Sequence, residues 1–66
     1  MGIGEQIQVQ REALGLSREA LAGRADVSLS TIYRVELAQS IPRRATLTVI
    51  RNALAECERE IQEAAA

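Results

Sequence analysis

The sequence predicts a small all-α domain with four helices, of which the last is long. Apolar residues recur at spacings of three and four along the chain, which is the period of a helix with one buried face. One Pro and four Gly in 66 residues leave little room for long loops. Tyr33 is the single aromatic residue, so the core must consist of Leu, Ile, Val and Ala side chains, as suits a helical bundle.

The first helix is expected from about residue 4 to residue 14, and Gly15 is the residue that ends it. Glycine suits this place because it takes up a left-handed backbone conformation without steric cost. The inner face of this helix is expected to consist of its apolar residues Ile7, Ala13 and Leu14.

Two short helices follow, at about residues 18–25 and 29–37, and each begins after a serine. Ser17 and Ser28 are good N-caps, because a serine hydroxyl accepts a hydrogen bond from a free backbone N–H of the first turn. Asp26 interrupts the helical pattern between the two helices. Together they form the pattern of a helix-turn-helix, whose second helix enters the major groove of DNA.

The outer face of that second helix carries four candidate residues for base contacts. Arg34 can donate two hydrogen bonds to guanine O6 and N7, a contact worth about 1–3 kcal/mol of discrimination. Leu29 is an apolar residue at an exposed position of the first turn. Contact with a thymine methyl group would explain it, and so would contact with a neighbouring loop. Ser30 can bond a base edge or a phosphate. Tyr33 can pack on a sugar and reach a phosphate with its hydroxyl, or be partly buried against the last helix.

Four further residues are candidate phosphate ligands. Arg18 lies in the first turn of a helix, where free N–H groups and the positive end of the dipole already favour an anion. Ser28 caps the next helix and can touch phosphate as well. Arg43 and Arg44 directly follow Pro42, which pre-sets the backbone for a helix start, and they flank the recognition helix. The alternative is that these arginines are ordinary solvated side chains.

The last helix is expected to run unbroken from Ala45, because residues 53–66 contain no Gly, Pro or Asn. Residues 1–55 are expected to form the DNA-binding domain and residues 56–66 a helical extension. The extension has nothing left in the short chain to cover, so a homodimer seam is expected, with a frayed tail or a fold-back as the alternatives. The apolar residues assigned to this seam are Leu54, Cys57 and Ile61.

Composition limits the other possibilities. The formal net charge is −1, but residues 1–55 carry seven Arg against five acidic residues while the tail is acidic, so the DNA-binding part is mildly basic. With one Cys and no His, neither a metal site nor a cofactor is expected, and no catalytic set of side chains is recognisable. Neither a signal peptide nor a membrane span is apparent, and the free Cys favours a reducing compartment, so we expect a cytoplasmic protein.

The chain resembles the Cro/repressor (XRE-like) family of bacterial and phage helix-turn-helix regulators. The resemblance covers about residues 7–54 and depends on several short matches at the family's spacing: Leu16-Ser17, Leu21-Ala22, Val27-Ser28, Ser30-Thr31-Ile32, Arg34-Val35-Glu36, Pro42 and Thr46-Leu47. It implies a lambda-repressor-like domain, and it implies that Arg11 pairs with Glu36. The family usually has Gly where this chain has Asp26 and Ala38, so the helix before Ala38 is expected to end later or in a different shape. In relatives the fourth helix commonly ends and a separate fifth helix follows, whereas one long helix is expected in this chain.

The function expected from these features is that of a dimeric, sequence-specific DNA-binding transcriptional regulator, a repressor that reads a palindromic operator. Double-stranded DNA and a second copy are the expected partners. An antitoxin of a toxin–antitoxin pair, which also binds a toxin, and a phage lysis–lysogeny or excision control protein are alternatives. A protein-interaction module on the same fold is an alternative from another class, because the basic charge is weak.

Overall fold

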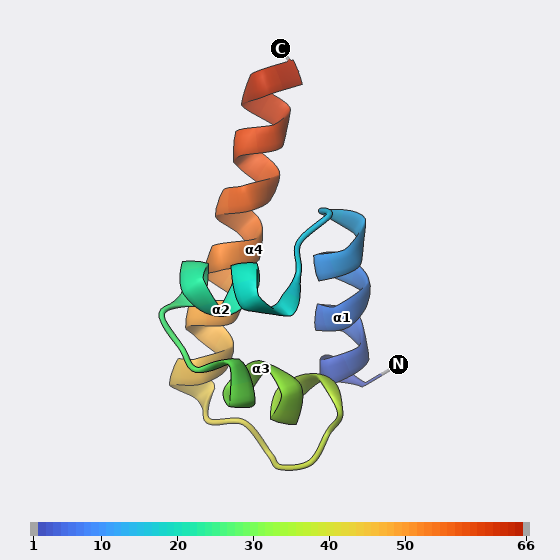
Figure 1. Ribbon diagram of the computed structural model, residues 1–66, viewed down its shortest axis with the longest axis vertical. Helices are drawn as coiled ribbons and strands as arrows, with labels where there is room; N and C mark the ends of the chain where they lie inside the picture. Colours follow the sequence, from blue (N-terminus) through green and yellow to red (C-terminus); the bar gives the residue numbers. More distant parts are fainter. Residues whose placement is uncertain (1, 66) are drawn as a thin grey trace.

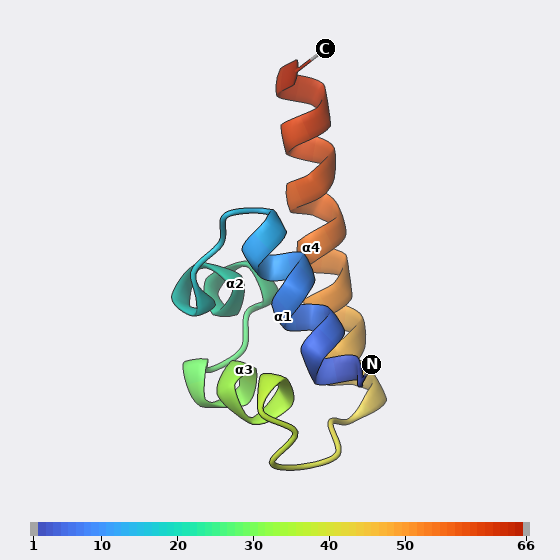
Figure 2. The ribbon, with the colours of Figure 1, turned by 90° about the vertical axis from the view of Figure 1, so that its right-hand side faces the viewer.

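The computed structural model describes residues 2–65, and the helices of this part are α1 (Ile3–Ala13), α2 (Arg18–Ala25), α3 (Leu29–Glu36) and α4 (Arg44–Ala65). Helix α4 spans the length of the molecule, and the other three helices pack beside its first half while its last turns extend beyond them (Figures 1 and 2). Helix α3 lies at the end opposite the C-terminal end of α4. The predicted all-α class and the long last helix are confirmed. None of the helices between residues 2 and 65 has both the length and the hydropathy of a membrane span.

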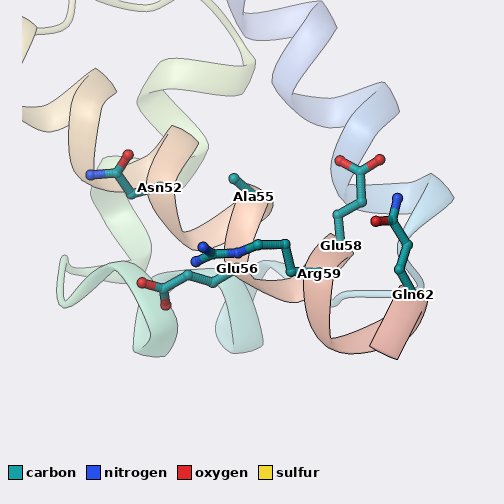
Figure 3. Close-up of a pocket in the computed structure, with 6 residues that line it drawn as sticks. All are labelled: Asn52, Ala55, Glu56, Glu58, Arg59 and Gln62. Carbon is teal, nitrogen blue, oxygen red and sulfur yellow. The ribbon is translucent and has the colours of Figure 1, made fainter. Parts of the chain in front are cut away.

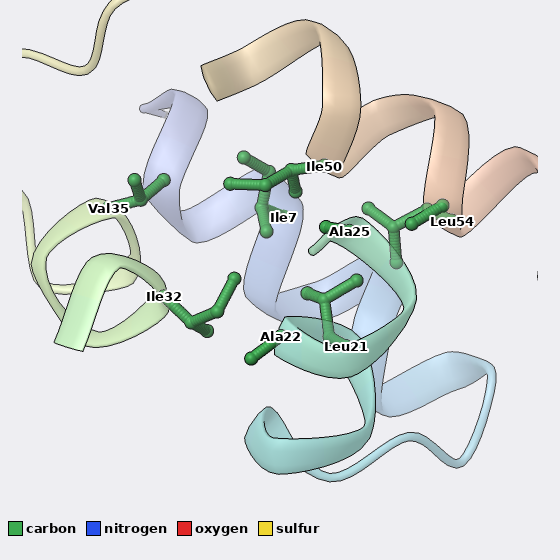
Figure 4. Close-up of a cluster of buried hydrophobic side chains, with 9 residues drawn as sticks. Ile7, Leu21, Ala22, Ala25, Ile32, Val35, Ile50 and Leu54 are labelled. Carbon is green, nitrogen blue, oxygen red and sulfur yellow. The ribbon is translucent and has the colours of Figure 1, made fainter. Parts of the chain in front are cut away.

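All four helices contribute aliphatic side chains to one core (Figure 4). Ile7 of α1, Leu21 of α2 and Ile32 of α3 are completely or almost completely buried, and they meet Ile50 and Leu54 of α4. Burying such a side chain stabilises a fold by about 1.5–3 kcal/mol, which is how a chain this short can hold four helices together.

The inner face of α1 differs from the expected one. Ile7 is buried as expected and Leu14 is half-buried, but Ala13 is exposed. The charged side chain of Arg11 takes the inner position instead, with an exposed fraction of 7%. The apolar pattern alone could not predict this position, because an arginine is buried only where a charged partner is present, and the pattern does not show that partner.

Three of the helices end in the same backbone motif. A residue with a positive φ lies one or two positions past each end, and this φ is 72° at Gly15, 57° at Asp26 and 54° at Ala38. In each case the following N–H donates to a carbonyl five residues back: Leu16 to Arg11, Val27 to Ala22 and Gln39 to Arg34. This is the Schellman arrangement. The expectation that α3 ends later or in a different shape for lack of a glycine is therefore wrong, because Ala38 itself adopts the left-handed conformation.

The expected homodimer seam on α4 needs a correction. Leu54 is 0% exposed and Cys57 is 4% exposed within the single chain, because the stripe they belong to packs on the core and on α2. Arg24 of α2 reaches one turn further and donates to both carboxylate oxygens of Glu60, at 3.0 and 2.9 Å. Of the three residues assigned to the seam, only Ile61 is exposed, at 48%. The predicted spacing of apolar residues along α4 is present, but these residues extend the core of the single chain.

Candidate nucleic-acid interface

Helices α2 and α3 and the turn between them are fixed by their own backbone and by two serine caps. The Ser17 hydroxyl accepts a hydrogen bond from the Ala20 N–H at 3.0 Å, and the Ser28 hydroxyl accepts one from the Thr31 N–H at 3.2 Å. Each bond satisfies one N–H that the first turn of a helix leaves without a partner. The left-handed residue Asp26 then turns the chain from α2 into α3.

Helix α3 has one face inside the molecule and one face outside. Ile32, Val35 and Glu36 are buried against the other helices. The four side chains assigned to base contacts are all exposed: Leu29, Ser30, Tyr33 and Arg34. An outer face of this kind is what a recognition helix presents to the floor of the major groove.

The inner face of α3 is anchored by a buried ion pair between Arg11 and Glu36. Arg11 donates from Nε to Glu36 Oε2 at 2.7 Å and from Nη2 to Oε1 at 3.2 Å. It also donates from Nη1 to the Leu16 carbonyl at 2.8 Å, which ties in the chain between α1 and α2. The side chain of Glu36 is 0% exposed. The pair therefore fixes the rotation of α3 about its own axis and, with it, the direction of the outer face.

Arg18 is a second arginine on the same carboxylate. Its Nε donates to Glu36 Oε1 at 3.0 Å, and its guanidinium carbon lies 4.8 Å from the centroid of the Tyr33 ring, within reach of a cation–π contact. The hydrogen bond to Glu36 raises the pKa of Arg18 above its ordinary value. The sequence assigned Arg18 only to phosphate and missed both contacts, which depend on the crossing of α2 and α3. The Arg18 side chain keeps 29% of its surface exposed, so it also reaches solvent.

The hydroxyl of Ser28 is engaged inside the protein. Besides the cap, it lies 2.9 Å from the Thr31 hydroxyl, and one of the two donates to the other. A phosphate at Ser28 must therefore share this oxygen with the first turn of α3. Ser30, the next serine, is exposed on the outer face.

Arg34 and Arg43 face a common hollow beside the C-terminal half of α3. The hollow has a volume of about 380 Å³ and lies between α3, the loop that follows it and the start of α4, where it is lined by Thr31, Arg34, Val35, Ser40, Ile41, Pro42, Arg43 and Thr46. Arg44, the first residue of α4, is exposed but does not line this hollow. Of these two candidate phosphate ligands, only Arg43 lines the hollow together with Arg34.

The acidic residues of the C-terminal half of α4 lie far from this surface. Helix α3 and the start of α4 occupy one end of the molecule, and residues 56–65 extend to the other end (Figure 1). The basic residues near α3 therefore do not face the acidic tail, and an anion that approaches α3 meets Arg18, Arg34 and Arg43 first.

Two short capped helices joined by a tight turn, the second with one buried face and one exposed face, are the defining feature of helix-turn-helix proteins. The sequence model of the helix-turn-helix domain matches residues 3–64, and the chain belongs to that family. No curated protein and no solved structure matches the chain significantly.

Proposed function

We propose that the protein is a sequence-specific transcriptional regulator in the cytoplasm, a repressor that binds a palindromic operator as a homodimer. The observation that carries the proposal is the orientation of α3, whose exposed face includes Arg34 while Ile32 and the Arg11–Glu36 pair hold the opposite face inside. Its proposed role is binding and not catalysis.

In this proposal, Arg34 reads guanine with its two donors, Leu29 contacts a thymine methyl group, and Ser30 and Tyr33 complete the base contacts. The neighbouring basic and hydroxyl side chains position the helix by holding phosphates, which supply affinity without sequence information. These phosphate ligands are Arg18, Ser28, Arg43 and Arg44.

The charge of the chain supports a need for two copies. Residues 1–55 carry only seven Arg against five acidic residues, so one protomer makes few phosphate contacts. Two protomers on a palindrome double those contacts and place two copies of α3 about one helical turn apart, roughly 34 Å.

Selection of bound sites from a random duplex library tests the proposal, followed by affinity measurements on the selected site at several salt concentrations. Arg34→Ala should relax the preference at one base position and cost about 1–3 kcal/mol of binding free energy. Arg59→Ala removes the same charge from an exposed position in the acidic half of α4 and serves as the matched control. Failure of the wild-type chain to bind any duplex would favour a protein-interaction module instead.

A further inference from the structure

Arg18 of α2 contacts two residues of α3, of which one is buried and one is exposed. Its Nε donates to Oε1 of the buried Glu36 at 3.0 Å, and its guanidinium carbon lies 4.8 Å from the centroid of the exposed Tyr33 ring. Tyr33 and Glu36 are three positions apart, so their side chains are neighbours on the surface of α3. Arg18 therefore connects the inner anchor of the helix to its outer face.

Glu36 is a fixed acceptor for Arg18. The side chain of Glu36 is 0% exposed, and Arg11 already donates to both of its oxygens, at 2.7 and 3.2 Å. A carboxylate has about four lone-pair sites, so Oε1 can accept a hydrogen bond from Arg18 as well. A guanidinium is planar, and a bond from its Nε to an anchored acceptor leaves it little freedom to turn. Glu36 thus fixes the plane that Arg18 presents to Tyr33.

The positive charge of Arg18 is not needed for the burial of Glu36, because Arg11 alone neutralises that carboxylate. Two arginines on one carboxylate leave one positive charge in excess, and Arg18 is the more exposed arginine, with 29% of its side chain accessible. The face of an aromatic ring attracts a charge of this kind. The contribution of the second arginine therefore lies at Tyr33, outside the core.

Tyr33 is a large side chain on the outer face of α3, with 39% of its surface exposed. An exposed side chain changes rotamer freely unless a contact holds it. A binding residue must be held within about 0.5 Å of its productive geometry to discriminate well. Stacking on Arg18 supplies this restraint before DNA is bound. Among residues 2–65, Arg18 makes its hydrogen bond to protein from Nε, so its terminal nitrogens can still bind a phosphate.

We propose that Arg18 is a positioning residue for Tyr33 and thereby a determinant of sequence specificity; this rests on the proposed function as a reader of DNA. Arg18 fixes the orientation of the ring, and the ring discriminates between the bases that it faces. A residue that only holds a phosphate weakens binding equally on all sequences. A positioning residue differs, because its substitution changes the preference for one base.

Affinities for the selected site and for its single-base variants test the proposal. Arg18→Lys keeps the charge but has no planar group to stack, and Tyr33→Leu removes the ring. We expect both variants to lose preference at the same base position, by about two- to fivefold for Arg18→Lys. The double substitution should lose no more preference than Tyr33→Leu by itself. An equal loss on every duplex in Arg18→Lys, or losses that add in the double variant, would overturn the proposal.

Two other arginines provide controls for the same substitution. Arg44→Lys changes an exposed candidate phosphate ligand. Arg59→Lys changes a residue of the acidic half of α4, which lines a shallow groove of about 480 Å³ together with Glu56 and Glu58 (Figure 3). The cation–π contact described within residues 2–65 is that of Arg18, so neither control should change the preference for any base. A change in either control equal to that of Arg18→Lys contradicts the proposal, because the effect would not depend on stacking.

Proton NMR of the free protein measures the contact itself. Tyr33 is the single aromatic residue of the chain, so an upfield ring-current shift of the Arg18 side-chain protons can come only from this ring. The shift should be present in the wild type and absent in Tyr33→Leu. If the wild type binds no duplex at all, the proposed function has failed, and this measurement still decides on the positioning contact. Shifted Arg18 protons support the contact, and Arg18 protons at their ordinary positions contradict it.

Discussion

The Nε of Arg11 lies 2.7 Å from Oε2 of Glu36, and both residues are buried although 25 positions separate them in the chain. Removing one partner of such a pair leaves the other charge buried and unpaired, which costs about 3–5 kcal/mol. Since small domains are only about 5–15 kcal/mol more stable than their unfolded chains, this pair decides whether α3 stays in place.

Glu36→Ala should therefore lower the free energy of unfolding by about 3–5 kcal/mol, because it strands Arg11. Urea denaturation followed by circular dichroism measures this change. Glu12→Ala is the control, since Glu12 lies 3.8 Å from Arg11 with 58% of its side chain exposed, and surface pairs contribute about 0–1 kcal/mol. Equal effects of the two substitutions would contradict the anchoring role of Glu36.

Ala38→Gly should raise the stability of the protein by about 1 kcal/mol. The φ of 54° at Ala38 costs an alanine roughly 1–2 kcal/mol, and a glycine avoids this cost. Part of the gain is offset because glycine has more conformational entropy in the unfolded chain. The melting temperature should rise by about 4–8 °C. Ala55→Gly, at an exposed position within α4, should instead lower stability by about 1 kcal/mol. If both substitutions destabilise the protein, Ala38 does not adopt the left-handed conformation.

Gly4→Ala should destabilise the protein by about 1–3 kcal/mol, the usual cost of overpacking. A Cβ at Gly4 would collide with the carbonyl oxygen of Val35 and crowd that of Glu36, so α1 must move away from the end of α3. A Cβ at Gly23 in α2 meets nothing within 4 Å. Gly23→Ala should therefore stabilise the protein by up to about 1 kcal/mol. Thermal unfolding of the two variants checks the opposite signs.

The Glu60 carboxylate should titrate at a lower pH in the folded protein than in Arg24→Gln. Its hydrogen bonds from Arg24 hold the pKa of Glu60 below the ordinary value of 4.5. Because the folded-state pKa is the lower one, the stabilising contribution is present above pH 4.5 and is lost as the pH falls through the folded-state pKa. Carbon-13 NMR of the labelled carboxylate measures both titrations. Coincident curves would mean that Arg24 and Glu60 do not pair in solution.

Local signals in the sequence were sufficient to predict the helices and the turn between α2 and α3. Ser17 and Ser28 marked two helix starts, and a side chain that tolerates a positive φ, Asp26, marked the turn. Each of these signals acts within a few residues, which is why a single sequence reveals it.

Contacts between helices could not be predicted in the same way. The stripe that includes Leu54 and Cys57 has the same spacing whether it packs on its own chain or on another copy, and only the position of α2 decides between the two. The bond from Arg18 to Glu36 likewise depends on how α2 crosses α3.

The left-handed alanine at the exit of α3 also bears on how the recognition helix opens. Its amide and that of Gln39 donate the hydrogen bonds that close the last turn, at 3.3 and 3.0 Å. Fraying there relieves the unfavourable backbone of Ala38, whereas fraying at the other end loses the cap of Ser28. Native-state hydrogen exchange in α3 should thus proceed from its C-terminal turn inward, so that the turn that carries Arg34 opens before the turn that carries Leu29.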